Sequence, residues 1–338
     1  MPMKSFELKK GLLFYENTKQ KGLKTVLVSL VGLQGSSYRK PGVRMFIAED
    51  GSMSGAISGG CVEKEVYQQA LSVFQSGVPK IISYDGRFRL GCEGFLYILI
   101  EAFTLETKKV AQLVSFLNDR QPLEIITHYK EALEAEGNFG SYFKMTQTGQ
   151  ELFIKSTLKN DPEDHLVFRQ TVLPNHQLIV IGAEHDAERL CEAAAFVGWE
   201  VVILASAKSI KSNTDFPKAK SLHLSNPDSF DFGCIDVYTS VVIMTHSYQY
   251  DLQYLIKLSV HHLSYIGILG SSKRKYQLEN DLLEFCPELE DHFLEAIHSP
   301  AGLSIGAVTP EEISISIIAE IMKVTQAKEQ ILSREKAK

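Results

Sequence analysis

The sequence predicts a two-domain α/β protein in which an N-terminal mixed α/β domain, with a glycine-rich cysteine loop, precedes a C-terminal doubly wound parallel sheet. The chain has 338 residues, more than the roughly 150 that one domain usually holds. Glycine is concentrated between residues 32 and 60, which indicates special backbone conformations there. After residue 177, short apolar runs alternate with helical segments, as in parallel strands joined by crossover helices.

Composition excludes several classes of protein. Hydrophobic residues make up 44% of the chain and charged residues 22%, which is typical of a globular protein and not of a disordered one. The net charge of −6 comes without any basic block, so we expect no nucleic-acid partner. No apolar run reaches the roughly 18 residues of a membrane span. The N-terminus lacks a secretory apolar segment and the five cysteines are scattered, so we expect a cytoplasmic protein.

The first domain is expected to cover residues 1–105. Apolar periodicity there predicts helices over 6–20 and 62–74 and strands over 24–31, 44–48, 80–84 and 95–102. Residues 106–170 are expected to form a middle segment. It contains most of a helix predicted over 104–118, then an antiparallel appendage over 122–157, and it ends in a linker. The linker is predicted because residues 160–175 are acidic and contain proline.

The second domain is expected to cover residues 171–326, with 327–338 as a charged tail. The sequence predicts strands over 178–181, 200–204, 241–244 and 265–269. It also predicts a helix over 186–197 and a second helix that follows the third strand and ends at about residue 262. Thr309, Pro310 and Glu312 predict the start of the last helix. The threonine caps it, the proline suits its first position, and the glutamate completes a capping box.

The loop after the first strand carries hydroxyls and cations among glycine and proline. Its polar side chains are Ser36, Ser37, Arg39, Lys40 and Arg44. Hydroxyl groups, exposed amides and cations together suit a phosphate or another anion. We therefore expect an anion site in this loop.

Ser58, Gly59, Gly60 and Cys61 directly precede the second predicted helix. A thiol ahead of a helix N-terminus is favoured as a thiolate by the helix dipole. Two preceding glycines allow a bulky group to approach. The alternative is a tight turn with an incidental buried cysteine, because cysteine is among the most buried residue types.

Cys92 lies between glycines at the start of a strand in the same domain. Together with Cys61 it would frame one metal or one reactive sulfur. No CxxC pattern or nearby histidine pair accompanies either thiol, so structural zinc is not expected. We assign no chemistry to Cys191, Cys234 and Cys286.

Residues 182–187 lie where a Rossmann-like unit carries its dinucleotide fingerprint, between a strand and a helix. Gly182 and Ala187 match the GxGxxG/A pattern, but Glu184 replaces the second glycine. A carboxylate there adds bulk and repels a pyrophosphate. The acidic residue that would bind a ribose is also missing near Ala205, so we expect no ordinary NAD(P) binding.

His246 and Ser271 follow two later strands and should therefore lie at the carboxyl edge of the sheet, where open α/β folds hold ligands. Residues 273–275 add a cluster of lysine and arginine to that edge. An anionic ligand would fit there. The alternatives are a histidine that caps the next helix and a solvated helix start.

Several motifs resemble the XdhC/CoxI family of xanthine dehydrogenase accessory factors. They are SLVGLQGSSYRKPGVRM, GAISGGCVE and LGCEG in the first half, and IGAEHDA, MTHSYQYDL, YIGILGSSKRK and SPAGLSIGAVTPEEISISIIAEI in the second. The motifs follow one another in order through both predicted domains. The middle appendage carries none of them.

The resemblance implies a cytoplasmic, usually dimeric accessory protein that binds molybdenum cofactor (molybdopterin) and assists its sulfuration. It further implies delivery to a molybdenum hydroxylase apoenzyme of the xanthine dehydrogenase type, with a cysteine desulfurase-type protein as sulfur donor. The family's two cysteines fall on Cys61 and Cys92, which are the implied metal ligands. Motif and resemblance together give the expected cofactor-binding residues: Ser36, Ser37, Arg39, Arg44, Ser58, Gly59, Gly60, Cys61, Cys92, Gly182, His185, His246 and Ser271.

Two other functions stay open at this point. An NAD(P)-dependent oxidoreductase would use the second domain, with His246 as acid or base. A scaffold would bind neither cofactor. The sequence shows no Ser/His/Asp set and no paired carboxylates at recognisable spacing, so we predict no catalytic residue and a carrier of the cofactor, in its mononucleotide or dinucleotide form.

Overall fold

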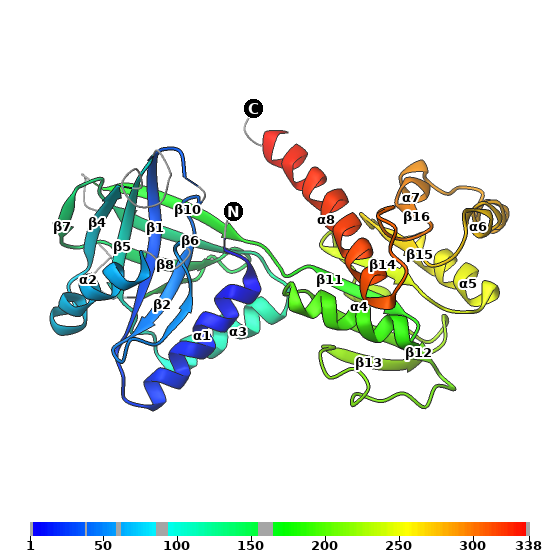
Figure 1. Cartoon of the computed structure of the whole chain (residues 1–338), viewed down its shortest axis with the longest axis horizontal. Helices are drawn as coiled ribbons and strands as arrows, with labels where there is room; N and C mark the ends of the chain where they lie inside the picture. The colour runs from blue at the N-terminus through cyan, green and yellow to red at the C-terminus, as the bar shows by residue number, and fades with distance from the viewer. Residues whose placement is uncertain (1–2, 38, 59–61, 86–93, 155–164, 336–338) are drawn as a thin grey trace. The chain divides into compact units, whose positions relative to one another are not determined.

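The computed structural model describes residues 3–37, 39–58, 62–85, 94–154 and 165–335. The chain divides into two compact units, Met1–Pro174 and Asn175–Lys338, and each is described by itself (Figure 1). Within the described residues, no helix combines the length and the apolar character that crossing a membrane requires.

The first unit contains three helices and ten strands among its described residues. The helices are α1 (Ser5–Gln20), α2 (Glu63–Ser76) and α3 (Thr107–Asn118). The strands are β1 (Thr25–Gly35), β2 (Arg44–Ala48), β3 (Met53–Gly55), β4 (Lys80–Asp85), β5 (Gly94–Ala102), β6 (Leu123–Tyr129), β7 (Glu134–Glu136), β8 (Gly140–Met145), β9 (Glu151–Phe153) and β10 (Leu166–Val172).

These strands form two antiparallel sheets. One has the order β3-β2-β1-β5-β4-β7 and the other β10-β6-β8-β9. Helix α2 packs on one face of the first sheet through Val66, Ala70 and Val73. Helices α1 and α3, which lie side by side in Figure 1, share a core with both sheets on its other side.

The predicted linker over residues 160–175 is wrong for its second half. Residues 155–164 lie outside the described residues, but Leu166–Val172 forms β10 and pairs with β6 from Leu166↔Tyr129 to Val172↔Leu123. Gln170 and Val172 are buried. The acidic and proline residues on both sides concealed a short run of strand-forming residues.

A buried guanidinium connects the two sheets. Arg44, at the start of β2, is 4% exposed and donates hydrogen bonds to Gln170 of β10 and, at 3.2 Å, to Thr127 of β6. Thr127 and Ser141 share a hydrogen bond of 2.9 Å, and the Ser141 hydroxyl donates at 2.6 Å to Glu101 of β5. The chain of hydrogen bonds therefore runs from a buried cation to a buried carboxylate.

Burial shifts the pKa of both ends of this network. Desolvation lowers the pKa of Arg44 to about 10, and the charge of Glu101 partly opposes it. Desolvation also raises the pKa of Glu101 to about 7, while hydrogen bonds from Ser141 and the charge of Arg44 oppose it. The native state therefore binds a proton at Glu101 more tightly than the unfolded chain does.

The second unit contains five helices and six strands among its described residues. The helices are α4 (His185–Phe196), α5 (Tyr248–Leu258), α6 (Ser272–Phe285), α7 (Asp291–Glu295) and α8 (Pro310–Glu335), with a 3-10 turn at Phe232–Cys234. The strands are β11 (Gln177–Ile181), β12 (Glu200–Ser206), β13 (Ser221–Ser225), β14 (Thr239–Ile243), β15 (Ile266–Ile268) and β16 (Ile297–His298).

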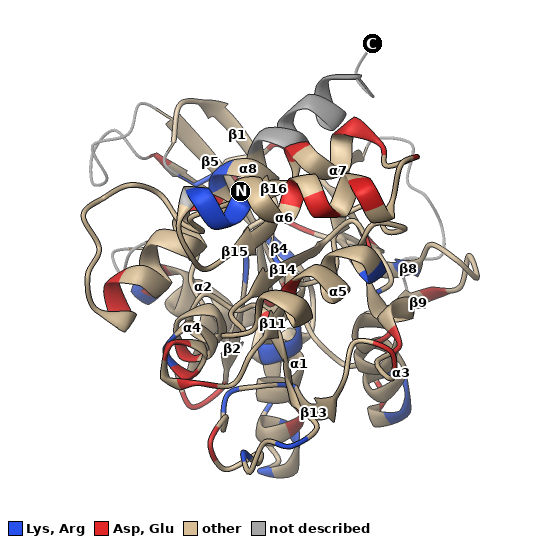
Figure 2. Ribbon diagram, turned by 90° about the vertical axis from the view of Figure 1, so that its right-hand side faces the viewer, with Lys and Arg blue, Asp and Glu red and all other residues tan. Residues whose placement is uncertain are grey.

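Neighbouring strands of this sheet run parallel, in the order β13-β12-β11-β14-β15-β16. The predicted parallel sheet is confirmed. Helices α4 and α8 cover one face, and α5, α6 and α7 cover the other. Figure 2 shows the central strands β11, β14 and β15 without charged residues, as expected for strands buried on both faces.

The predicted start of the last helix is also confirmed. Pro310 is the first residue of α8. The Glu312 backbone N–H donates at 3.3 Å to the Thr309 hydroxyl, and the Thr309 N–H donates at 3.1 Å to the Glu312 carboxylate. These two bonds form the reciprocal capping box.

Replacing Glu101 with Gln should remove a pH dependence from the stability of the first unit. Because the pKa of Glu101 is raised to about 7, ionising this group costs the native state free energy as pH rises through the interval between the ordinary value and 7. The unfolding free energy of the unmodified protein, relative to Glu101→Gln, should therefore fall by about 2 to 3 kcal/mol between roughly pH 4.5 and pH 7.5.

Urea denaturation across this pH range measures the difference. The matched control is Glu151→Gln, since Glu151 is an exposed carboxylate of the same unit. It should run parallel to the unmodified protein. A Glu101→Gln curve that also stays parallel would show that the raised pKa is wrong.

Candidate functional site

Three loops leave the first sheet at one end. The end of β1 pairs with the start of β5 through Gly35↔Gly94, and β4 ends at Asp85, opposite Phe95. β3 runs antiparallel to β2 and ends at Gly55, opposite Met45. The described residues that flank segments 36–43, 56–62 and 86–93 therefore lie at the same end of the sheet. The sequence alone could not show that these strand ends share one end of the sheet.

The first of these loops is tightly held at its start. A Cβ on Gly94 would lie 2.6 Å from the Ser36 carbonyl oxygen, so the two backbones touch there. Ser36 and Lys40 are exposed, while Ser37 and Arg39 are half-buried. The loop thus presents hydroxyls and cations at the edge of the sheet.

Arg44 does not belong to this anion site. Its side chain is buried, and its guanidinium donates to Gln170 and Thr127 inside the unit. The expectation that Arg44 contacts a phosphate from solvent is therefore corrected. Arg44 starts a strand, and its side chain faces the second sheet.

The second loop is closed by a clamp. The Glu63 carboxylate accepts from the Ser58 backbone N–H at 2.7 Å and from the Ser58 hydroxyl at 2.8 Å. The Ser58 Oγ in turn accepts from the Val62 N–H at 3.3 Å. Ser58 therefore holds the two ends of the loop together, a role that the sequence did not indicate.

The glycine-cysteine motif itself lies outside the described residues, as does the second thiol. This concerns Gly59, Gly60, Cys61 and Cys92. The described start of α2 has Glu63 and Glu65 in its first turn, so carboxylates already face the positive end of the helix dipole. The helix alone then gives less support to a thiolate than the sequence suggested.

The second unit has two adjoining cavities at the carboxyl edge of its sheet. Their volumes are about 310 and 330 Å³. Both are lined by Glu184, Met244, Thr245 and His246, from the loops after β11 and β14. His246 is exposed and lies between the cavities, as the sequence predicted for a residue at this edge.

A positioned cation lines the smaller cavity. Arg274 of α6 donates to the Asp251 carboxylate at 2.5 Å from Nη2 and 3.2 Å from Nε. Asp251 is 1% exposed and also accepts from Thr245. The Arg274 guanidinium also lies 5.6 Å from the ring centre of Tyr248. These contacts fix the direction of Arg274 and leave its charge next to the cavity.

The larger cavity is lined with hydroxyls. They come from Ser206, Ser209, Ser225, Ser247 and Tyr250. Ala205, by contrast, is fully buried in the core with α4 and α8. Because successive residues of a strand point to opposite faces, the position for a ribose-binding carboxylate is Ser206, and the assignment to Ala205 is corrected.

Gly182 is required by packing inside the protein. Its φ is +134°, and a Cβ would lie 2.7 Å from the Met244 carbonyl oxygen. Only glycine accommodates this approach of β11 to the end of β14. The first glycine of the fingerprint is therefore explained without a ligand.

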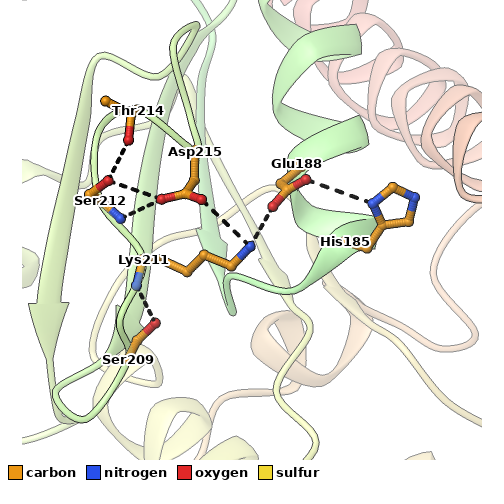
Figure 3. Close-up of polar contacts among 7 residues, drawn as sticks. All are labelled: His185, Glu188, Ser209, Lys211, Ser212, Thr214 and Asp215. Atoms are coloured by element: carbon orange, nitrogen blue, oxygen red, sulfur yellow. Dashed lines mark hydrogen bonds and ion pairs between the residues drawn. The ribbon is translucent and has the colours of Figure 1, made fainter.

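Lys211, two residues after the cavity-lining Ser209, is paired with carboxylates. Lys211 Nζ lies 2.6 Å from Glu188 and 3.9 Å from Asp215, as Figure 3 shows. The hydrogen bond to Glu188 raises the pKa of Lys211. This pair ties the segment after β12 to the first turn of α4.

His185 and Ser271 have local roles. His185 Nδ1 lies 3.7 Å from Glu188, so its ring lies beside the first turn of α4 (Figure 3). Ser271 caps α6 by accepting from the Arg274 N–H at 3.4 Å. Ser271 therefore supports the helix that carries Arg274. Neither residue lines the described cavities.

Arg274 and Asp251 are the site residues that sequence reasoning missed. Arg274 was visible only as one member of a basic cluster. Asp251 lies 23 positions earlier, and no local pattern links the two. A signal does exist at Gly270, where a Cβ would lie 2.8 Å from the Arg274 Cδ, so glycine makes room for the arginine stem.

Comparisons with known proteins match both units. The model described as the XdhC Rossmann domain matches residues 178–321, and that of the XdhC and CoxI family matches 19–85. A Bacillus subtilis protein named as a probable subunit of xanthine dehydrogenase is 30% identical over 317 residues, 88% of this chain and 92% of the relative. The Escherichia coli protein named molybdenum cofactor insertion chaperone PaoD is 25% identical over 314 residues, 91% of this chain and 86% of its own.

A solved structure is similar over nearly the whole chain. It is a crystal structure from Bacillus halodurans described as a xanthine dehydrogenase. Its TM-score is 0.77 at 27% identity, and the match covers 96% of each chain. The similarity therefore includes the middle strands as well as the motif-bearing segments.

NAD should bind weakly to the unmodified protein, because the Glu184 carboxylate lines both cavities and Ser206, in the larger one, offers no charged acceptor. Paired replacement of Glu184 by Gly and Ser206 by Asp removes a repulsive group and adds a ribose acceptor. It should raise NAD affinity at least tenfold, about 1.4 kcal/mol, in a calorimetric titration.

The single variants Glu184→Gly and Ser206→Asp serve as controls, and each should give only part of the gain. Tight NAD binding by the unmodified protein would contradict the prediction and favour an oxidoreductase.

Proposed function

We propose that this chain, which belongs to the XdhC/CoxI family, is an accessory protein that binds molybdenum cofactor and inserts it into a xanthine dehydrogenase-type apoenzyme. Its family is shown by the relative that is 30% identical over 88% of the chain. The family resemblance seen in the sequence motifs is confirmed by the two family models. The observation that carries the proposal is the 25% identity, over 91% of the chain, to a protein named as a molybdenum cofactor insertion chaperone.

The donor groups at the end of the first sheet fit such a cargo. The loop after β1 offers the Ser36 and Ser37 hydroxyls together with the cations of Arg39 and Lys40, which suit the phosphate of a pterin cofactor. The Ser58–Glu63 clamp closes the adjacent loop, in which the sequence carries Cys61. A soft thiolate suits molybdenum or its exchangeable sulfido ligand. The cofactor itself supplies the redox-active metal that the client enzyme needs.

The carboxyl edge of the second unit, taken by itself, offers a place for an anionic group. Arg274 supplies the positive charge, and Asp251 holds it in place. His246 lines both cavities and supplies a second nitrogen donor. The carboxylates of Glu184 and Asp186 restrict where an anion can approach, so Arg274 determines its position.

The proposal extends to steps in which this protein meets others. The chain protects the cofactor while it receives its sulfido ligand from a cysteine desulfurase-type donor. It acts in the cytoplasm as a homodimer and passes the cofactor to a molybdenum hydroxylase apoenzyme. In this account the protein is a carrier without a catalytic residue, and Cys61 with Cys92 contacts the metal or its sulfur.

Replacing Cys61 with Ser should weaken cofactor retention strongly, because oxygen is a poorer ligand than thiolate for a soft metal centre. Molybdenum and pterin content would be measured in protein purified from cells that make the cofactor. Cys234→Ser is the matched control, since Cys234 is exposed. Cys191 is less suitable, because it is buried in the core of the second unit.

Equal retention by Cys61→Ser and Cys234→Ser would contradict a thiol ligand at Cys61. If the unmodified protein also contained neither molybdenum nor pterin, the proposed function as a whole would be contradicted.

Replacing Arg39 with Ala should weaken cofactor binding without changing the fold. Loss of one charge-assisted hydrogen bond to a phosphate costs roughly 1.5 to 3 kcal/mol. Lys21→Ala is the control, because Lys21 follows α1 at the opposite end of β1 and is exposed. Titration calorimetry with the isolated cofactor measures both, and equal affinities would leave Arg39 as a surface charge.

A further inference from the structure

A separate cluster of metal-ligating side chains lies at the other edge of the parallel sheet. His262 lies in the segment between α5 and β15, and Glu290 and His292 lie at the start of α7, directly before β16. Because β15 and β16 are parallel, both segments lead into the amino ends of their strands. The cluster is therefore on the edge opposite the two cavities that Arg274 and His246 line.

We propose that His262 and His292 form a binding site for a divalent transition metal ion such as Zn²⁺ or Cu²⁺. The His262 Nδ1 and the His292 Nε2 are 3.2 Å apart, while the ring centres are 5.0 Å apart. The two nitrogens are thus the parts of the rings that approach most closely. Two nitrogens bound to one tetrahedral zinc ion at 2.0 to 2.1 Å lie about 3.3 Å apart, so the spacing already suits a shared metal.

Glu290 prepares His292 for this role. Its carboxylate oxygen lies 2.8 Å from the Nδ1 of His292, and one ligand atom of each of the three side chains lies within 4.8 Å of the others. A carboxylate there accepts the Nδ1 proton, which leaves the lone pair on Nε2. This is the arrangement that metal-binding histidines usually have, and it raises the basicity of the ligand.

The two histidines are held in place by the residues that follow them. Leu263 and Phe293 are buried in the core on this face of the sheet, and they directly follow His262 and His292. The rings themselves are accessible from solvent, and the His292 side chain is 41% exposed. A fixed backbone with open side chains is suited to capturing an ion from solution.

The surroundings favour a cation and leave room for it. The cluster opens into a cavity of about 430 Å³ that Glu288 and Glu290 also line. Asp291 and Glu295 add carboxylates on α7, and Figure 2 shows this acidic segment. Water can fill the remaining coordination positions, while Glu290 keeps its contact with the Nδ1 of His292.

Without a metal, the same distance is a hydrogen bond between the two rings. His262 then donates its Nδ1 proton to the Nε2 of His292. With a metal bound, the proton of His262 would sit on its Nε2 instead, so that both facing nitrogens become ligands. The site thus needs a tautomer change at His262 and no large movement.

Calorimetric titration of the whole protein with Zn²⁺, and electron paramagnetic resonance with Cu²⁺, test the proposal. His262→Ala and His292→Ala should each lower the affinity of this site at least tenfold. Glu290→Gln should lower it by 10- to 100-fold, as loss of an orienting carboxylate typically does. The matched controls are His223→Ala, an exposed histidine of the same unit, and Cys286→Ser, a thiol that lines the same cavity.

The Cu²⁺ spectrum of the unmodified protein should show nitrogen ligands that His262→Ala loses, so the test does not depend on the folding of His292→Ala. Unchanged Zn²⁺ affinity and an unchanged Cu²⁺ spectrum in His262→Ala would overturn the proposal. An equal loss in His223→Ala would overturn it too, since binding would then be a general property of surface histidines. The result is independent of the proposed cofactor function, because none of these variants touches its candidate residues.

Discussion

The first unit depends on one buried cation. Arg44 starts the strand that leads away from the anion loop, and it reaches Glu101 through hydroxyls of the second sheet. Both terminal nitrogens of the Arg44 guanidinium donate hydrogen bonds, while its buried Nε has no partner. Burying this charge is costly without those bonds, so the two sheets must keep their register for the network to exist. That register also determines which end of the first sheet carries the three loops. The network therefore holds the backbone from which the candidate cofactor site extends.

The second unit uses the same principle at its carboxyl edge. Asp251 is buried and would be costly there without a partner, and Arg274 provides one from a different helix. The pair leaves the guanidinium at the wall of a cavity in an otherwise acidic surrounding, next to Glu184 and Asp186. The departure from the dinucleotide fingerprint at Glu184 thus coincides with a cation supplied from the first turn of α6, the helix that follows β15. This lining is the reason for proposing one anionic group at Arg274 and for predicting weak NAD binding.

The sequence predicted the parallel sheet because its strands are continuous apolar runs, which is what burial on both faces requires. It did not predict β10, whose strand-forming residues lie next to an acidic, proline-containing segment. It also assigned Arg44 to an anion, because its partner Gln170 lies 126 residues away. The sequence also placed the residue expected to bind a ribose one position too early. Successive residues of a strand face opposite sides, so Ala205 is in the core while Ser206 lines the cavity. Local patterns could predict helices and strands. The partner of Arg44 and the pairing of β10, by contrast, depend on contacts between distant segments.

The topology of the parallel sheet would also separate the two proposed ligands by charge. Every loop that follows a strand lies at its carboxyl edge, where Arg274 and His246 are. Every segment that precedes a strand lies at the amino edge, where His262, His292 and the carboxylate of Glu290 are. An anionic group and a divalent cation would therefore bind to the same sheet without competing for donors. Because each site lies on loops and helix starts at its own edge of the same strands, either could change its side chains without altering the backbone that supports the other.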